Sequence, residues 1–301
     1  MSNRVLKVSI FIAVIVLIGV AIAGCGPKKV GTEENPIVWA VVPSGETERV
    51  VAGFEKVADF IFEETGYVVE PLVATEYAGV IEAMCSDPAK AQMGSLATFA
   101  YILAADKGCA EAELVSVRFG IPTYNGQIYV RADSGLEAVS DLADKTFCRP
   151  DPLSTSGWIV PSIVLKANGI DPDTGLAEVV DAGSHDAAVA GVYNGDCDAG
   201  SSYVDARTRV EEDYPDVMEV IKVIEISPDI PNDGVQYVPG LDREYRDAIN
   251  NALIKMSETE EGVEALGEAY QWSELAKIDD TFYDTFRQYL DAAGIDVTSL
   301  Q

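Results

Sequence analysis

The sequence has few basic residues and almost no histidine. Its 301 residues carry 21 Lys plus Arg against 50 Asp plus Glu, and His185 is the only histidine, so the formal net charge is −29. This balance argues against nucleic-acid binding, because no basic stripe is present to displace counterions from phosphates. Any anion site must rely on local hydrogen-bond donors rather than on the overall field. The five cysteines include no C-x-x-C pair and the only histidine lies elsewhere, so we expect no metal site. We also expect no cofactor.

Long apolar runs are also scarce, and the clearest one opens the chain. Two basic residues precede an apolar run at residues 8–23, which is typical of a signal peptide. The run ends in Ile-Ala-Gly-Cys, which resembles a bacterial lipobox ending at Cys25. A transmembrane anchor is the alternative, but about 16 apolar residues fall short of the roughly 20 that a span requires. We therefore predict a signal peptide at residues 1–24, a lipid on Cys25, a polar tether at 25–35 and an extracytoplasmic, membrane-anchored lipoprotein.

From Ile37 onward, short apolar runs alternate with amphipathic ones. The first series predicts strands at 37–42, 67–73 and 91–96, with helices at 46–64, from Thr75, and at 98–106. A second series of the same kind runs from 145 to 203. Repeated β–α units indicate an α/β fold with mostly parallel sheets flanked by helices.

Two turn-rich segments, near residues 121–127 and 227–235, separate the two series. They predict a pair of hinge crossings between two lobes. Lobe 1 would contain residues 36–126 and 230–301, mostly helical after residue 242, and lobe 2 would contain residues 127–229. The ligand site is expected in the cleft, beyond the carboxyl ends of the strands.

Four cysteines remain after Cys25, and an even number in an exported chain favours two disulfides. Four cysteines permit three pairings. We favour Cys85 with Cys109 and Cys148 with Cys197, because each pair then lies inside one predicted lobe.

The stretch Asp151–Trp158 contains three consecutive hydroxyl residues, Ser154, Thr155 and Ser156, followed by Gly157. It lies between a predicted strand and a predicted helix, so it places hydroxyls and free backbone N–H groups at a helix start. An ordinary N-cap is the alternative interpretation, but one hydroxyl suffices for capping. The three together indicate an anion site.

Five motifs in order carry a resemblance to a known family. They are Ala74–Ala83, Val130–Gly135, Asp151–Gly157, Gly183–Ala188 and Gly195–Gly200. With them the chain resembles the extracytoplasmic solute-binding proteins of ABC importers, in the phosphate, phosphite and phosphonate branch. The resemblance implies a two-lobed, type II periplasmic-binding-protein-like fold that closes on an oxyanion, an ABC permease as membrane partner, and a monomer.

The positions that match this family imply a set of ligand contacts. They are Tyr77, Tyr124, Ser154, Thr155, Ser156, His185 and Asp205. His185 would donate to the ligand, although a lone histidine is also common as a surface or core residue. Tyr77 and Tyr124 would donate from the opposite wall, or pack between the lobes.

Asp205 is unusual beside an anion, because its carboxylate repels one unless a proton or a ligand ammonium group lies between them. In that role it would discriminate against sulfate, which carries no proton near neutral pH. The alternative is that Asp205 caps the helix that starts at Ala206.

The resemblance thus implies a capture protein for phosphonate, phosphite or phosphate. A sensor subunit that binds the same ligands is one alternative. A phosphoester hydrolase is another, and it would need His185 to act as a base for a nucleophile among the three hydroxyls.

Overall fold

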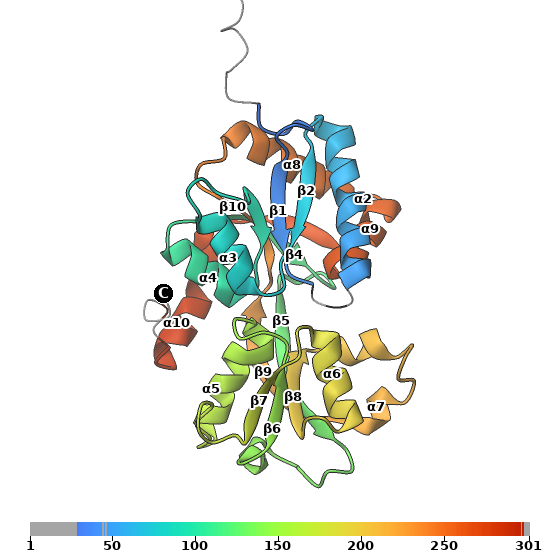
Figure 1. Ribbon diagram of the computed structural model, residues 1–301, viewed down its shortest axis with the longest axis vertical. Coiled ribbons are helices and arrows are strands. Elements are labelled where there is room, and N and C mark those ends of the chain that lie inside the picture. The colour runs from blue at the N-terminus through green and yellow to red at the C-terminus, as the bar shows by residue number, and fades with distance from the viewer. Residues whose placement is uncertain (1–28, 44, 46, 296, 298–301) are drawn as a thin grey trace, which may run out of the picture.

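The computed structural model describes residues 29–43, 45, 47–295 and 297. The predicted signal peptide and Cys25 lie outside the described residues. No helix in the described part of the chain is both long and apolar enough to cross a membrane. The chain forms two lobes, each built on one sheet, which lie one above the other in Figure 1.

Lobe 1 contains a six-stranded sheet in the order β11-β4-β10-β3-β1-β2. The strands are β1 (Ile37–Val41), β2 (Val69–Val73), β3 (Met93–Ser95), β4 (Glu111–Val117), β10 (Gly234–Tyr237) and β11 (Glu274–Lys277). The helices are α2 (Thr47–Thr65), α3 (Tyr77–Cys85), α4 (Thr98–Asp106), α8 (Arg243–Met256), α9 (Glu260–Tyr270) and α10 (Asp284–Ala292). Helices α3 and α4 lie on one side of the sheet, and α2 and α9 on the other (Figure 1).

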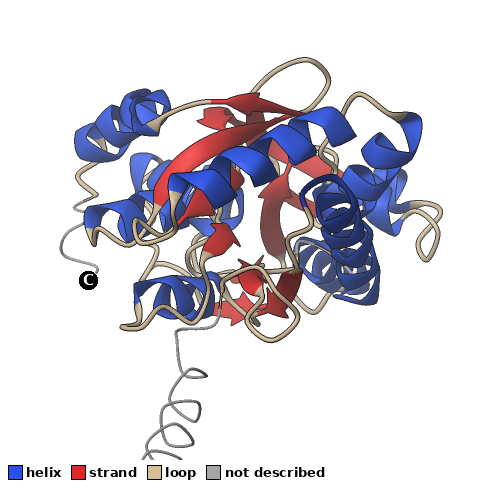
Figure 2. Ribbon diagram, turned by 90° about the horizontal axis from the view of Figure 1, so that it is seen from above, coloured by secondary structure: helices blue, strands red, loops and turns tan. Residues whose placement is uncertain are grey.

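Lobe 2 contains a five-stranded sheet in the order β7-β6-β8-β5-β9. The strands are β5 (Thr123–Arg131), β6 (Thr146–Arg149), β7 (Glu178–Asp181), β8 (Ala199–Tyr203) and β9 (Ile221–Pro231). The helices are α5 (Val160–Ala167), α6 (His185–Asn194) and the short α7 (Val217–Val220). Helix α5 lies on one side of this sheet and α6 on the other (Figure 1). In the view from above, helices flank the strands of the molecule on both sides (Figure 2).

The predicted two-lobed α/β fold is confirmed, but the sheets are mixed rather than mostly parallel. β1 pairs in parallel with β2 and β3, and β6 with β7 and β8, whereas the pairs made by β10, β11 and β5 are antiparallel. Strands β10 and β11 were not predicted from the sequence, and they fall in a predicted turn and in a predicted helical region. Each has four residues, too few to show a period, and both owe their conformation to β4, which lies between them.

The crossings between the lobes are shorter than the turn-rich segments suggested. They occupy residues 118–122, between β4 and β5, and residues 232–233, between β9 and β10. The other residues of the predicted turns belong to strands β5 and β9, whose pairing shifts register between Asn125 and Gln127. The crossings lie side by side, because the Asn232 N–H donates to the Pro122 carbonyl over 2.9 Å.

Helix α2 shows how the core of lobe 1 is assembled. Its buried side chains Val50, Phe54, Val57 and Ile61 recur at three- and four-residue spacing and face the sheet and α9. Gly53 permits the close approach to α9, since a Cβ at this position would lie 2.4 Å from the Ala269 nitrogen. A second, smaller cluster packs α6 against the sheet of lobe 2.

The described end of the predicted tether is attached to lobe 1. Residues 31–35 form a turn in which the Gly31 N–H donates to the Asn35 carbonyl over 2.8 Å. The Gly31 carbonyl accepts from the Val68 N–H over 2.9 Å, and Val30 packs against the core. The chain is therefore held by lobe 1 from Val30 onward.

Both predicted disulfides are present and confirm the favoured pairing. Cys85 bonds Cys109 in lobe 1, and Cys148 bonds Cys197 in lobe 2, with sequence separations of 24 and 49. Cys148 and Cys197 are each 2% exposed and belong to the α6 cluster. The second bond thus anchors β6 to the loop that leads into β8.

Replacing both Cys148 and Cys197 by Ala is expected to lower the free energy of unfolding by about 3 to 4 kcal/mol, because the disulfide no longer restricts the conformational entropy of the unfolded chain by closing a long loop. Removing the Cys85–Cys109 bond, which closes a shorter loop, should cost less. Urea unfolding monitored by circular dichroism measures both losses. A loss below about 1 kcal/mol for the Cys148–Cys197 pair would contradict the stabilising role.

Candidate functional site

A cleft of about 730 Å³ lies between the lobes and is lined by residues of both. Four helix starts meet at this cleft. Tyr77 begins α3, Ala97 precedes α4, Ser154 and Ser156 lie in the turn that leads into α5, and His185 begins α6. Helix starts present unpaired N–H groups and the positive end of the helix dipole, so the cleft is arranged for an anion even though the chain is acidic.

The predicted hydroxyl turn forms a π-helical turn, Thr155–Ile159, in front of α5. The Ser154 carbonyl accepts from both the Trp158 and the Ile159 N–H groups, over 2.9 and 3.0 Å. The Ser154 hydroxyl caps the turn by accepting from the Gly157 N–H over 3.1 Å. Because its oxygen already accepts a bond, its proton is left to donate to a ligand in the cleft. The capping and anion-binding interpretations are therefore compatible.

Thr155 is the one predicted contact that does not line the cleft. It is fully buried, and its hydroxyl accepts from the Phe99 N–H in the first turn of α4, over 2.9 Å. Asp151 makes a similar bond, since its carboxylate accepts from the Tyr77 N–H over 3.0 Å. Helices α3 and α4 have no side-chain cap from their own N-cap residues. Two side chains of lobe 2 thus cap two helices of lobe 1.

The carboxyl of Asp151 is mostly enclosed at this contact. Burial raises its pKa, and the hydrogen bonds from the Leu153 and Tyr77 N–H groups oppose that shift. The sequence motif included Asp151, but nothing in the motif indicated that its partner belongs to the other lobe.

Tyr124 lies at the start of β5, close to the hydroxyl turn. Burial raises the pKa of its phenol to about 12, and hydrogen bonding with Ser156 opposes the shift. Burial, followed by the nearby Tyr270 and Asp151, likewise holds the pKa of Tyr77 well above its ordinary value. Both tyrosines are therefore neutral near pH 7 and able to donate an O–H bond.

His185 is 7% exposed and lines the cleft. Burial, and then the charge of Arg118, lowers its pKa to about 3. The ring is therefore neutral at physiological pH and donates through one N–H rather than as a cation. Its Nδ1 atom is buried and has no hydrogen-bond partner among the described residues, so the first-turn histidine can still bond a ligand.

Asp205 lines the cleft, and its backbone is left-handed, with φ at +72°. Its side chain is exposed and makes no capping hydrogen bond to the turn that follows. The capping interpretation is therefore not supported, while the role in selectivity stays a prediction.

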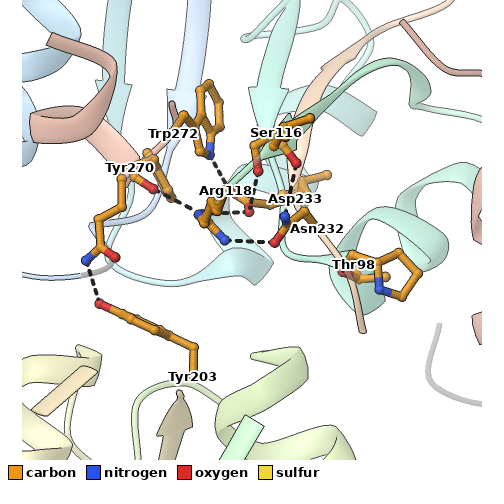
Figure 3. A network of polar contacts seen from close by, with 12 residues as sticks. Thr98, Ser116, Arg118, Tyr203, Asn232, Asp233, Tyr270 and Trp272 are labelled. Carbon is orange, nitrogen blue, oxygen red and sulfur yellow. Dashed lines mark hydrogen bonds and ion pairs between the residues drawn. The ribbon is translucent and has the colours of Figure 1, made fainter. Parts of the chain in front are cut away.

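The residues that surround the hinge were not predicted from the sequence. Arg118 donates to Asn232 over 2.9 Å, to Asp233 over 2.9 Å and to the Tyr270 carbonyl over 3.0 Å, as Figure 3 shows. Its guanidinium also lies 5.9 Å from the centre of the Tyr124 ring. Arg118, Asp233 and Tyr270 all line the cleft. Arg118 and Asp233 lie beside or within predicted turns, which was their one signal in the sequence, whereas Tyr270 lies in a region predicted to be helical.

Two further contacts join the lobes and were not predicted. Arg49 of α2 lies 3.4 Å from Asp186 of α6, and Gln271 donates to the Tyr203 hydroxyl over 2.9 Å. With the bonds of Asp151 and Thr155, they hold the lobes together around the cleft. The structure thus shows the lobes closed on each other.

Comparison with known proteins agrees with this geometry. Residues 39–283 match the family described as "ABC transporter, phosphonate, periplasmic substrate-binding protein". The chain belongs to this family. The match confirms the resemblance inferred from the five motifs.

Two characterised relatives are moderately similar. The chain is 29% identical over 210 residues to the phosphate-import protein PhnD of Mycolicibacterium smegmatis, covering 65% of each chain. It is 24% identical over 240 residues to the phosphonates-binding periplasmic protein of Escherichia coli, covering 78% of this chain and 70% of the relative. The matched region thus spans about two thirds of their length.

Among solved structures, a binding protein component of an ABC phosphonate transporter from Pseudomonas aeruginosa superposes with a TM-score of 0.78 at 25% identity, covering 86% of this chain and 87% of the other. A Prochlorococcus marinus protein crystallised with methylphosphonate superposes with a TM-score of 0.75 at 13% identity, covering 86% and 98%. The second likeness shows the fold alone.

The buried, neutral His185 predicts a specific sensitivity to acid. Between its folded pKa of about 3 and its ordinary value of 6.5, the unfolded chain binds a proton that the folded protein does not bind. The contribution of neutral His185 to the free energy of unfolding is therefore fully present above about pH 6.5 and is lost as the pH falls towards 3.

We expect His185→Gln to remove this pH-dependent contribution of the histidine. Below about pH 6 the free energy of unfolding should then fall more steeply in wild type than in the variant, by up to about 1.4 kcal/mol per pH unit. Urea unfolding at a series of pH values measures the two slopes. Parallel curves from pH 4 to pH 8 would show that the histidine is not held neutral by the fold.

Proposed function

We propose that this chain is the extracytoplasmic solute-binding component of an ABC importer and captures a phosphorus oxyanion, namely a phosphonate, phosphite or phosphate. One observation carries the proposal. The hydroxyl of Ser154 faces the cleft at a helix start with its acceptor side already used by a backbone N–H, so it is oriented to donate. Ser156 and Tyr124 lie beside it and supply further donors.

The energetics are sufficient for capture by neutral groups. A tetrahedral oxyanion offers several lone pairs, and each charge-assisted hydrogen bond contributes roughly 1.5 to 3 kcal/mol. About four to six such bonds supply the ~8 kcal/mol of micromolar binding when the lobes exclude water. Ser154, Ser156, Tyr124, Tyr77 and His185 are donors of this kind in the cleft.

The names of similar proteins support the same ligand class. The Mycolicibacterium relative is named for phosphate import and the Escherichia relative for phosphonates. The choice among these ligands depends on the space beside one oxygen of the bound group. We extend only their shared chemistry, an oxyanion of phosphorus, to this chain.

Delivery to a membrane permease is part of the proposal, with a lipid on Cys25 holding a monomeric protein close to it.

A hydrolase is disfavoured by the positions of its required groups. General-base catalysis needs a histidine bonded to the nucleophile, and in the described part of the chain no hydrogen bond joins His185 to Ser154, Thr155 or Ser156. A sensor subunit would use the same cleft, but the matched family is described as a substrate-binding protein of an ABC transporter.

Ser156→Ala is expected to weaken methylphosphonate binding about tenfold or more, because one charge-assisted bond is lost. Ser162→Ala is the matched control, since the Ser162 hydroxyl bonds the Ile159 carbonyl over 2.8 Å within the α5 region and does not line the cleft. Titration calorimetry with methylphosphonate, phosphite and phosphate measures the affinities. Equal affinities in Ser156→Ala and wild type would contradict the proposed site. If wild type bound none of the three ligands, the proposed function would be contradicted.

Asp205→Asn is expected to shift selectivity in two directions. Hydrogen phosphate should bind more weakly because its proton loses a carboxylate acceptor, while sulfate should bind more tightly because a repelling charge is gone. Competition between sulfate and phosphate in the two proteins measures the shift. An unchanged ratio would leave Asp205 without a part in selectivity.

A further inference from the structure

The segment Tyr270–Trp272 begins with the last residue of α9 and is fixed to the hinge on both sides. On one side the Tyr270 carbonyl accepts from Arg118 over 3.0 Å, and on the other the Trp272 indole donates to Asp233 over 3.0 Å. Figure 3 shows that Arg118 and Asp233 belong to one polar network with Asn232. Because this network includes a residue of each crossing, the segment moves with the hinge strands.

Gln271, between these two anchors, has a left-handed backbone with φ at +58°. This conformation is unfavourable for a residue with a Cβ atom, and glycine is the usual choice where a helix ends in this way. The Gln271 N–H still caps α9 by bonding the Gly267 carbonyl over 2.9 Å. Glycine would serve this capping role without strain, so the glutamine side chain calls for a separate explanation.

That side chain reaches the other lobe. Gln271 Nε2 donates to the hydroxyl of Tyr203, the last residue of β8, over 2.9 Å. The Tyr203 ring in turn packs edge-on against the His185 ring, with 4.8 Å between ring centres. All three residues line the cleft. The contact thus runs from the hinge network to a proposed ligand-binding residue.

We propose that Gln271 is a positioning residue for ligand retention: anchored by Arg118 and Asp233, it bonds Tyr203 and holds the lobe carrying His185 closed over the ligand. The inference rests on the proposed function for its ligand, but the contact itself does not depend on which ligand is bound. Gln271 and Tyr203 form a latch, by which we mean this one cross-lobe hydrogen bond.

The latch differs in its anchoring from the ion pair between the lobes. Arg49 and Asp186 lie 3.4 Å apart with side chains 33% and 11% exposed, and Arg49 extends from α2 rather than from the hinge crossings. The latch begins on a segment that both sides of the hinge hold in place. Opening the lobes must therefore break the bond or distort the hinge network.

The test is a double-mutant cycle with Gln271→Met and Tyr203→Phe, and methylphosphonate, phosphite and phosphate are the probes. Methionine keeps the length of the side chain, and phenylalanine keeps the ring against His185, so each change removes one end of the latch. We expect each single variant to release the bound probe about fivefold faster, as loss of one neutral hydrogen bond does, and the double variant to be no faster than either single one. Association rates should stay within about twofold.

Gln271→Gly separates the latch from a purely structural role. It removes the side chain and relieves the left-handed backbone, so the melting temperature should hold or rise while probe release again becomes about fivefold faster. A residue that only capped α9 would show no change in release. Unchanged release in Gln271→Gly, or effects of the two single variants that multiply in the double variant, would overturn the proposal.

A readout without ligand keeps this outcome distinct from failure of the proposed function. Small-angle scattering of the ligand-free proteins should show a larger radius of gyration for Gln271→Met than for wild type. If wild type binds none of the three probes, the proposed function fails, and scattering alone decides whether the latch holds the lobes closed. Superimposable scattering curves would then overturn it.

Discussion

The structure depends on four helix starts that point into one cleft. Tyr77, Ala97, the hydroxyl turn and His185 lie at these positions. A chain with a net charge of −29 repels anions at long range. Backbone N–H groups at helix starts, which carry a fixed positive polarity and no titratable charge, give it a local attraction at one place. The neutral states of His185, Tyr77 and Tyr124 suit this arrangement, because donors without charge need no counterion when the cleft is empty.

The same helix starts explain why the lobes meet. Helices α3 and α4 of lobe 1 have no side-chain caps of their own, and Asp151 and Thr155 of lobe 2 supply them. Opening the cleft exposes those N–H groups to water, and closing it pairs them. Thr155 belongs to the hydroxyl turn whose neighbours line the cleft, so the surface that closes the lobes and the surface that faces the ligand are parts of one loop. A change in this loop is therefore expected to alter affinity and closure together.

The hinge has a different chemistry from the cleft. Arg118 joins Asn232, Asp233 and the Tyr270 carbonyl, so one partly buried cation connects both crossings with the end of α9. Asp233 balances its charge at 2.9 Å, with the Arg118 and Asp233 side chains 20% and 13% exposed. A paired cation of this kind gives the crossings a fixed geometry. It also adds to the effect of burial in keeping His185 unprotonated.

By itself the sequence determined whatever depends on near neighbours in the chain. The periodic runs predicted α2, α4 and β1 almost to the residue, Ser154–Gly157 indicated a capped helix start, and grouping the cysteines by lobe predicted both disulfides. Tertiary structure alone decided which distant groups meet. Nothing near Thr155 shows that its hydroxyl turns to Phe99, and nothing near Arg118 shows that its partners lie more than 100 residues away. The short strands β10 and β11 were missed for the same reason, since four residues have no period and take their conformation from β4. Local propensity acts over a few residues, whereas a hydrogen bond between lobes exists only after the packing of both sheets has brought its two ends together.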